Sequence, residues 1–192
     1  MFIIATTRYW VNRMALSLPD ELIKLEANCG LYALWMVLQH QGIQANIQEL
    51  IKLSKYDQDE GTYSIALAIA LKKMGFGVSF YTDQDPNISK KERTCYEEAK
   101  QLNIPIKGVL SYQGILQATQ NNKFVMVYYD TLDGVGQQSL VHSIDKNRID
   151  FFDNFGSMSA TVFERQRKAE GICQQAIVID DTNFNPMALQ RA

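Results

Sequence analysis

The sequence predicts an α+β fold in which an N-terminal helical lobe packs on a C-terminal antiparallel sheet. Apolar residues recur with helical spacing through most of the first 121 residues, whereas alternating and β-branched segments dominate afterwards. A chain of 192 residues, 46% of them hydrophobic, is long enough to form one sizeable core. We therefore predict a single domain over residues 1–181, followed by a C-terminal tail over residues 182–192.

The helices are predicted from apolar spacing and from the signals at their ends. Pro19 and the two acidic residues after it mark a helix start or a turn. The segment 28–41 is the strongest helix, and Gly42 ends it. Its buried stripe, at positions i, i+3, i+4 and i+7, consists of Leu31, Leu34, Trp35 and Leu38. Further helices are predicted over residues 47–54, 64–74, 90–102 and 112–121.

The strands are predicted from alternation and from aromatic and β-branched content. One short strand, 77–81, precedes the change in character along the chain. The segment 145–147 has the length of a tight hairpin turn. The remaining strands are predicted over residues 123–129, 139–144, 148–153 and 175–180. A helical half followed by a run of strands is typical of α+β proteins.

Composition argues against several classes of protein. Lys and Arg number 19 against 21 Asp and Glu, and this near balance argues against a nucleic-acid binder. No apolar stretch approaches the roughly 18 residues of a spanning helix, so we expect no membrane partner. The apolar run at residues 2–5 is short and soon interrupted, which favours a strand or an ordered arm over a signal peptide. We expect a protein that is cytoplasmic as synthesised; secretion into a target cell without a cleaved signal is the alternative.

The cysteines do not form a recognisable framework. Cys29, Cys95 and Cys173 lie far apart, and their odd number argues against a set of disulfides. A structural zinc site needs four Cys or His ligands, usually in close pairs, and the sequence contains no such pairs. It contains no phosphate-binding loop, dinucleotide fingerprint or serine-hydrolase elbow either. We therefore expect neither a metal nor another cofactor.

Cys29 is the candidate nucleophile. It stands at the start of the strongest predicted helix, where partial positive charge and free N–H groups stabilise a thiolate. The same N–H groups can donate to an oxyanion, and Gly30 beside the cysteine leaves room for a substrate backbone. The alternative is a structural cysteine that packs as a small hydrophobic residue.

A nucleophilic cysteine generally needs a base, and only two histidines are available. His40 lies on the same predicted helix as Cys29, about 16 Å further along it, and cannot reach the thiol. His142 is therefore the candidate base. Alternation places it on one face of its strand with Leu140 and Ile144. The alternative is a half-buried histidine with a structural role.

Asp153 is the candidate residue that orients the histidine. Around a two-residue loop at 146–147, His142 is expected to face Phe151, which makes Asp153 its diagonal neighbour on the same face. Asn154 is the alternative orienting residue, since Cys-His-Asn sites also exist. The alternative to both is a polar turn that simply ends the strand.

A cysteine at the head of a helix, with His142 on one strand and Asp153 at the end of the next, resembles the papain-like cysteine peptidases. Within this group, residues 29–38 are similar to the nucleophile helix of the double-glycine leader peptidases that process bacteriocins. They are also similar to the corresponding segment of the related actin-maturation proteases. The resemblance covers residues 19–180 and implies a helical lobe, a sheet-rich lobe and a cleft between them.

The resemblance also implies a mechanism and a protein or peptide substrate. Cys29 would attack an amide carbonyl, His142 would protonate the leaving amine, and Asp153 would orient the imidazole. Ile23 stands where these families usually carry a glutamine that donates to the oxyanion; Asn28 is the adjacent candidate donor, and Asn12 is a more distant one. Peptide-bond cleavage is the expected reaction.

Two alternatives stay open. The same residues could serve a glutamine deamidase or an acyltransferase, for example an effector or toxin, because the acceptor and the cleft decide the outcome. The second alternative is a protein of another class, a binding module that keeps the fold but lacks catalysis. The missing glutamine supports this alternative. The order Cys, His, Asp along the chain argues against it.

Overall fold

The computed structural model describes residues 18–153 and 157–184. The predicted N-terminal strand or arm, Asn12, Asn154 and most of the predicted tail lie outside these residues. Each of the five helical segments predicted with both bounds is confirmed to within one residue at either end. The helices of the described part are α1 (Asp20–Ile23), α2 (Cys29–His40), α3 (Ile47–Leu53), α4 (Ser64–Lys73), α5 (Lys90–Gln101), α6 (Tyr112–Gln120) and α7 (Ala160–Arg167).

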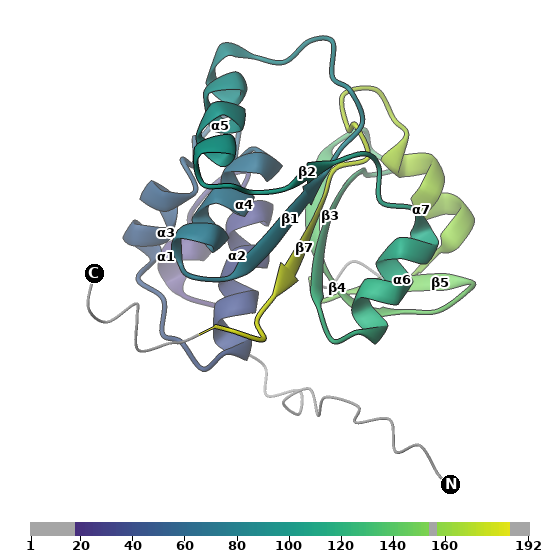
Figure 1. The fold of residues 1–192 in the computed structure, drawn as a ribbon, viewed down its shortest axis with the longest axis horizontal. Coiled ribbons are helices and arrows are strands. Elements are labelled where there is room, and N and C mark those ends of the chain that lie inside the picture. Colours follow the sequence, from purple (N-terminus) through teal and green to yellow (C-terminus); the bar gives the residue numbers. More distant parts are fainter. Residues whose placement is uncertain (1–17, 154–156, 185–192) are drawn as a thin grey trace, which may run out of the picture.

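The strands form one sheet, which confirms the α+β class (Figure 1). In spatial order they are β2 (Ile106–Lys107), β1 (Gly77–Tyr81), β7 (Ala176–Asp180), β3 (Phe124–Asp130), β4 (Gly136–Ile144), β5 (Arg148–Phe151) and β6 (Met158–Ser159). All neighbours pair antiparallel except β1 and β2, which are parallel. Because β7 returns to lie between β1 and β3, the helical and the strand-rich parts of the chain share this one sheet.

Helices cover both faces of the sheet, as the two sides of Figure 1 show. Side chains of the central strand β3 alternate between two clusters: Phe124 and Met126 belong to the cluster under α2 and α4, whereas Val125 and Val127 belong to the cluster under α6 and α7. This alternation is the period of two expected of a strand buried on both faces. The sequence analysis missed α7, so it predicted only α6 of the second layer.

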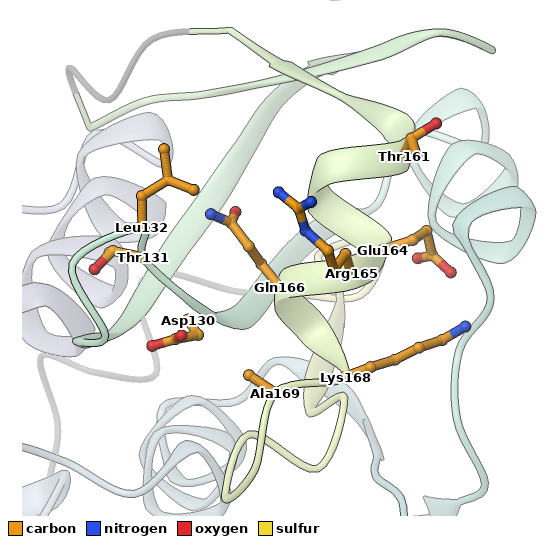
Figure 2. A pocket seen from close by; sticks show the side chains of 9 residues that line it. All are labelled: Asp130, Thr131, Leu132, Thr161, Glu164, Arg165, Gln166, Lys168 and Ala169. Atoms are coloured by element: carbon orange, nitrogen blue, oxygen red, sulfur yellow. The ribbon is translucent and has the colours of Figure 1, made fainter.

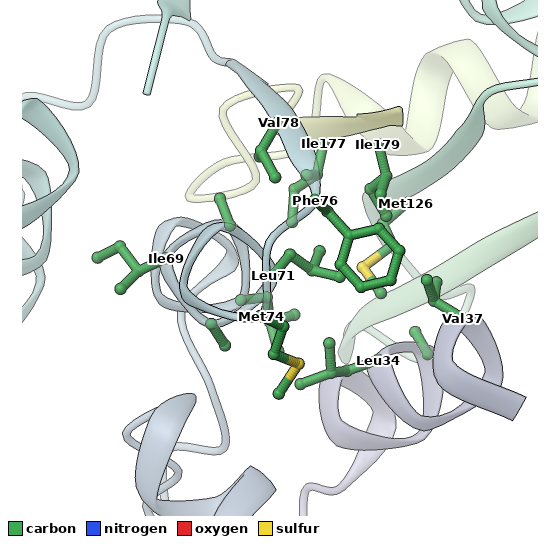
Figure 3. Packing of buried hydrophobic residues seen from close by; sticks show 14 of the residues in the cluster. Leu34, Val37, Ile69, Leu71, Met74, Phe76, Val78, Met126, Ile177 and Ile179 are labelled. Carbon is green, nitrogen blue, oxygen red and sulfur yellow. The ribbon is translucent and has the colours of Figure 1, made fainter. Parts of the chain in front are cut away.

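The first layer fixes the position of α2, the helix that carries Cys29. In Figure 3, Leu34 and Val37 of α2 lie beside Phe76 and Met126, and all four side chains are buried. Leu31 and Leu38 of the predicted stripe are buried as well. Since this apolar face is held against the sheet, the N-terminal end of α2 is held at a set place beside β4.

The hairpin between β4 and β5 departs from the predicted register. Ser143 pairs with Asp150 as the predicted two-residue loop requires, but a β-bulge then shifts the ladder, and Val141 pairs with Phe151. The prediction that His142 faces Phe151 was therefore wrong. The bulge lets Val141 join the second cluster beside Phe151, whereas the regular register would turn an imidazole into that apolar layer. His142 is the extra residue of the bulged strand, and it is exposed.

Candidate active site

A pocket of about 360 Å³ surrounds the candidate nucleophile. Cys29 lines the pocket, is half-buried and stands at the first position of α2. Gly30 allows Gln138 of β4 to approach the helix closely. A Cβ atom at position 30 would lie only 2.9 Å from Gln138 Oε1. The pocket is lined by Leu18, Leu22, Ile23, Asn28, Cys29, Tyr32, Gln137 and Asp153.

The surroundings of the Cys29 thiol disfavour its ionised form. Burial raises the pKa of the thiol, and the nearby Asp153 carboxylate acts in the same direction. Backbone N–H groups of Gln138, Gly30 and Cys29 itself donate to the sulfur and lower its pKa, but they do not outweigh burial. The thiolate expected from the helix N-terminus alone is thus opposed by desolvation.

Asp153 reaches the same pocket from the end of β5. The residue is only 7% exposed, and burial raises the pKa of its carboxyl group. Its Oδ2 accepts hydrogen bonds from Gln137 Nε2, at 3.2 Å, and from the Ser139 hydroxyl. Its Oδ1 is buried and has no hydrogen-bond partner. Such an orphaned acceptor is rare in proteins and calls for an explanation.

The structure does not bring His142 to this pocket. Cys29 meets β4 at Gln138, and His142 lies four residues further along the strand, roughly 13 Å away at the rise of a β-strand. Its ring instead packs edge-on against Phe152, with centroids 4.7 Å apart. Of the three residues predicted as a triad, Cys29 and Asp153 therefore share a pocket, and His142 does not.

Gln137 stands beside Asp153 where the sequence analysis expected an imidazole. It was missed because the strand was predicted to begin at residue 139, three residues after its start at Gly136, and because only histidines were considered as partners of the cysteine. Continuing the alternation of β4 backwards from Ser139 would have placed Gln137 on the same face. That face is the one on which Asp153 accepts hydrogen bonds from both residues.

The remaining predicted residues have varied settings. Asn28 lines the pocket, but its Nδ2 donates to the Leu22 carbonyl at 2.8 Å, so its role as an oxyanion donor stays a prediction. His40 lies at the far end of α2, edge-on to Phe124, as expected of a residue that cannot serve Cys29. Among the described residues, no group of three or more His, Cys, Asp or Glu is placed to hold a metal ion, and no helix is long and apolar enough to span a membrane.

A second and larger cavity, of about 760 Å³, lies away from Cys29. Figure 2 shows it between the turn that follows β3, at Thr131 and Leu132, and the helix α7, which presents Arg165 and Gln166. The described residues that line it include no cysteine or histidine. The chemistry that the sequence predicts thus belongs to the smaller pocket.

The cysteine at the head of a helix, packed on a sheet and sharing a pocket with an aspartate from the end of a neighbouring strand, defines the class of the protein as a papain-like cysteine peptidase. The comparison with family models agrees. The model of the peptidase C39 family matches residues 23–130, more than half of the chain. The chain belongs to this family and is a cysteine peptidase by family and by fold, so the predicted resemblance is confirmed. The matched part includes Cys29 and ends before β4.

A solved structure supports the same fold. The peptidase domain of Streptococcus ComA, a bi-functional ABC transporter involved in a quorum-sensing pathway, is similar to this chain with a TM-score of 0.51. The match covers 79% of this chain and 90% of that domain, at 18% sequence identity. No curated protein matches the chain. At this identity the likeness concerns the fold.

Proposed function

We propose that this cysteine peptidase binds a peptide segment of its substrate in the Cys29 pocket and cleaves it only slowly. The observation that carries the proposal is the position of Gln137, which lies beside Asp153 in the Cys29 pocket and donates to the carboxylate. A side-chain amide has no titratable group near neutral pH, so it can neither take the thiol proton nor protonate a leaving amine.

The expected loss of rate follows from two missing contributions. A positioned acid or base accelerates such reactions by about 10²–10⁴-fold, and the described lining of the pocket includes no histidine to supply it. The nucleophile is also weakened, because burial raises the pKa of Cys29 and leaves little thiolate at neutral pH.

The Cys29 pocket has features that favour peptide binding. Backbone N–H groups surround the Cys29 sulfur and can donate to a carbonyl oxygen. Leu18, Leu22 and Ile23 offer an apolar wall, and Ile23 is 57% exposed. A pocket that combines apolar walls with a few directed polar groups is typical of sites that bind ligands.

Efficient amide hydrolysis at Cys29 is the second candidate. It is favoured by membership in the peptidase C39 family and by the N–H donors at the sulfur. In that reaction the sulfur bonds to the carbonyl carbon, the thiol proton passes to the leaving nitrogen, and water later releases the acyl group. Because His142 does not line the pocket in this structure, efficient hydrolysis needs another base. Deamidation and acyl transfer would use the same first step and stay predictions.

Alkylation of Cys29 separates the two candidates. Wild type and the variant His142→Ala are treated with iodoacetamide from pH 4 to 9, and modified cysteines are located by mass spectrometry, with Cys95 and Cys173 as internal references. We expect Cys29 to react only at alkaline pH, and equally in both proteins. Reaction well below pH 7 that disappears in His142→Ala would establish a thiolate–imidazolium pair and overturn the proposal.

A further inference from the structure

The unpartnered oxygen of Asp153 indicates what the pocket recognises. Asp153 is more than nine-tenths buried and lines the Cys29 pocket, and its Oδ1 has no hydrogen-bond partner. A buried carboxylate oxygen without a donor is unfavourable by itself. The pocket therefore favours an occupant that brings a donor to this oxygen.

The other lining residues narrow the chemistry of that occupant. Asp153 is the only Asp, Glu, Lys or Arg among the residues that line the pocket, so the described lining offers no cation to balance its charge. The lining also includes Leu18, Leu22 and Ile23, which form the apolar wall. An apolar wall that leads to a carboxylate suits a long side chain with an apolar stem and a cationic head. A charged donor also binds a carboxylate about twice as strongly as a neutral one.

We propose that the Cys29 pocket selects a lysine or arginine side chain of the bound peptide, with its head on Asp153 Oδ1 and its stem on the apolar wall. This inference rests on the proposed function, peptide binding, and adds the class of residue that is bound. Gln137 is half-buried and donates to the other carboxylate oxygen, so it competes with an incoming head for Asp153. Its flexible side chain has to swing aside for the incoming head.

The test is an affinity selection on the full chain. A synthetic heptapeptide library, randomised except at its centre, carries Lys, norleucine, Arg or citrulline there, and captured peptides are counted by mass spectrometry. Norleucine lacks the ammonium group of lysine, and citrulline keeps hydrogen-bond donors of arginine without its charge. We expect Lys and Arg peptides to be enriched about tenfold over their neutral partners, the ratio that charged over neutral hydrogen bonds imply.

The variants link this preference to Asp153. Asp153→Asn is expected to abolish it, and Gln137→Ala to strengthen it by removing a competing donor to the carboxylate. Asp150→Asn, on the same hairpin but outside the pocket lining, is the matched control and should leave it unchanged. If a variant fails to fold, the comparison of neutral and charged peptides on the wild type still tests the preference.

The outcomes separate the two proposals. Enrichment of all four groups to the same extent would overturn the cation preference and leave peptide binding intact. Equal enrichment of Arg and citrulline peptides over norleucine peptides would overturn it too, in favour of an uncharged donor. Capture of no peptide at all would overturn the proposed function itself, and the preference with it.

Discussion

Replacing Asp153 by Asn should stabilise the protein at neutral pH. The ionised carboxylate is buried with one oxygen unpartnered, and burial raises its pKa even though Ser139 and Gln137 donate to it. Asparagine removes the buried charge but leaves an equally unpartnered N–H group in place of Oδ1, so the gain comes from the charge alone and we expect it to be on the order of 1 kcal/mol at pH 7. Each kcal/mol corresponds to about 2–4 °C in Tm for a chain of this size.

The pH dependence gives the prediction its sign. A carboxyl group whose pKa is higher in the folded state destabilises that state once it ionises, so the penalty grows as the pH rises from the unfolded value of about 3.9 through the folded pKa. The advantage of Asp153→Asn should therefore be present at pH 7 and disappear near pH 3. The assay is urea denaturation of both proteins across this range.

Asp150 on the same hairpin is the opposite case and serves as the control. Hydrogen bonds from Ser143, and more weakly the pair with Arg148, lower the pKa of Asp150. Asp150→Asn should therefore lose stability at pH 7, by at most about 1 kcal/mol for so exposed a pair. Our reading of Asp153 is refuted if Asp153→Asn is less stable than wild type at pH 7, or if their difference is the same at pH 3 and pH 7.

Three further predictions concern the framework of the site. Phe163→Ala, in the fully buried centre of the second cluster, should lower the free energy of unfolding by about 3–5 kcal/mol in urea denaturation; an unchanged midpoint would contradict that packing. Gly30→Ala places a methyl group 2.9 Å from an amide oxygen and should destabilise by about 1–3 kcal/mol, whereas Gly108→Ala, in open space, should stay within about 0.5 kcal/mol. Hydrogen bonds from Thr182 help to lower the pKa of Asp180 to about 2. Asp180 should therefore contribute stability above pH 4 that is lost as the pH falls toward 2. The variant Asp180→Asn should show a weaker loss of stability in acid, as measured by denaturation at pH 2–5.

The parts of the site set by local sequence were predictable. The stripe of α2 and the glycine after it place Cys29 at the first residue of a helix, and the structure has that helix from Cys29 to His40. The strand segments before and after the hairpin turn were also predicted. Each of these features depends on residues close together in the chain, where spacing alone indicates the structure.

The parts set by strand register were not predictable. One bulge between Val141 and Ser143 exchanges the faces of the residues before it, and it forms because Val141 fits the second apolar layer better than His142 does. Gln137 could not be recognised as the neighbour of Asp153 until that register was known. The helix α7 was missed because Phe163 is its only fully buried large apolar residue, too few for a helical stripe.

The most direct test of the central claim is the peptidase activity of Gln137→His. A fluorescence-quenched heptapeptide library is incubated with wild type, Gln137→His and the double variant Gln137→His/Cys29→Ala. If Gln137 in place of a base limits the reaction, Gln137→His should cleave at least about 10²-fold faster than wild type, the lower end of what a positioned base supplies. The double variant should be inactive. Wild type that already cleaves as fast as Gln137→His, and loses its activity in His142→Ala, would contradict the account.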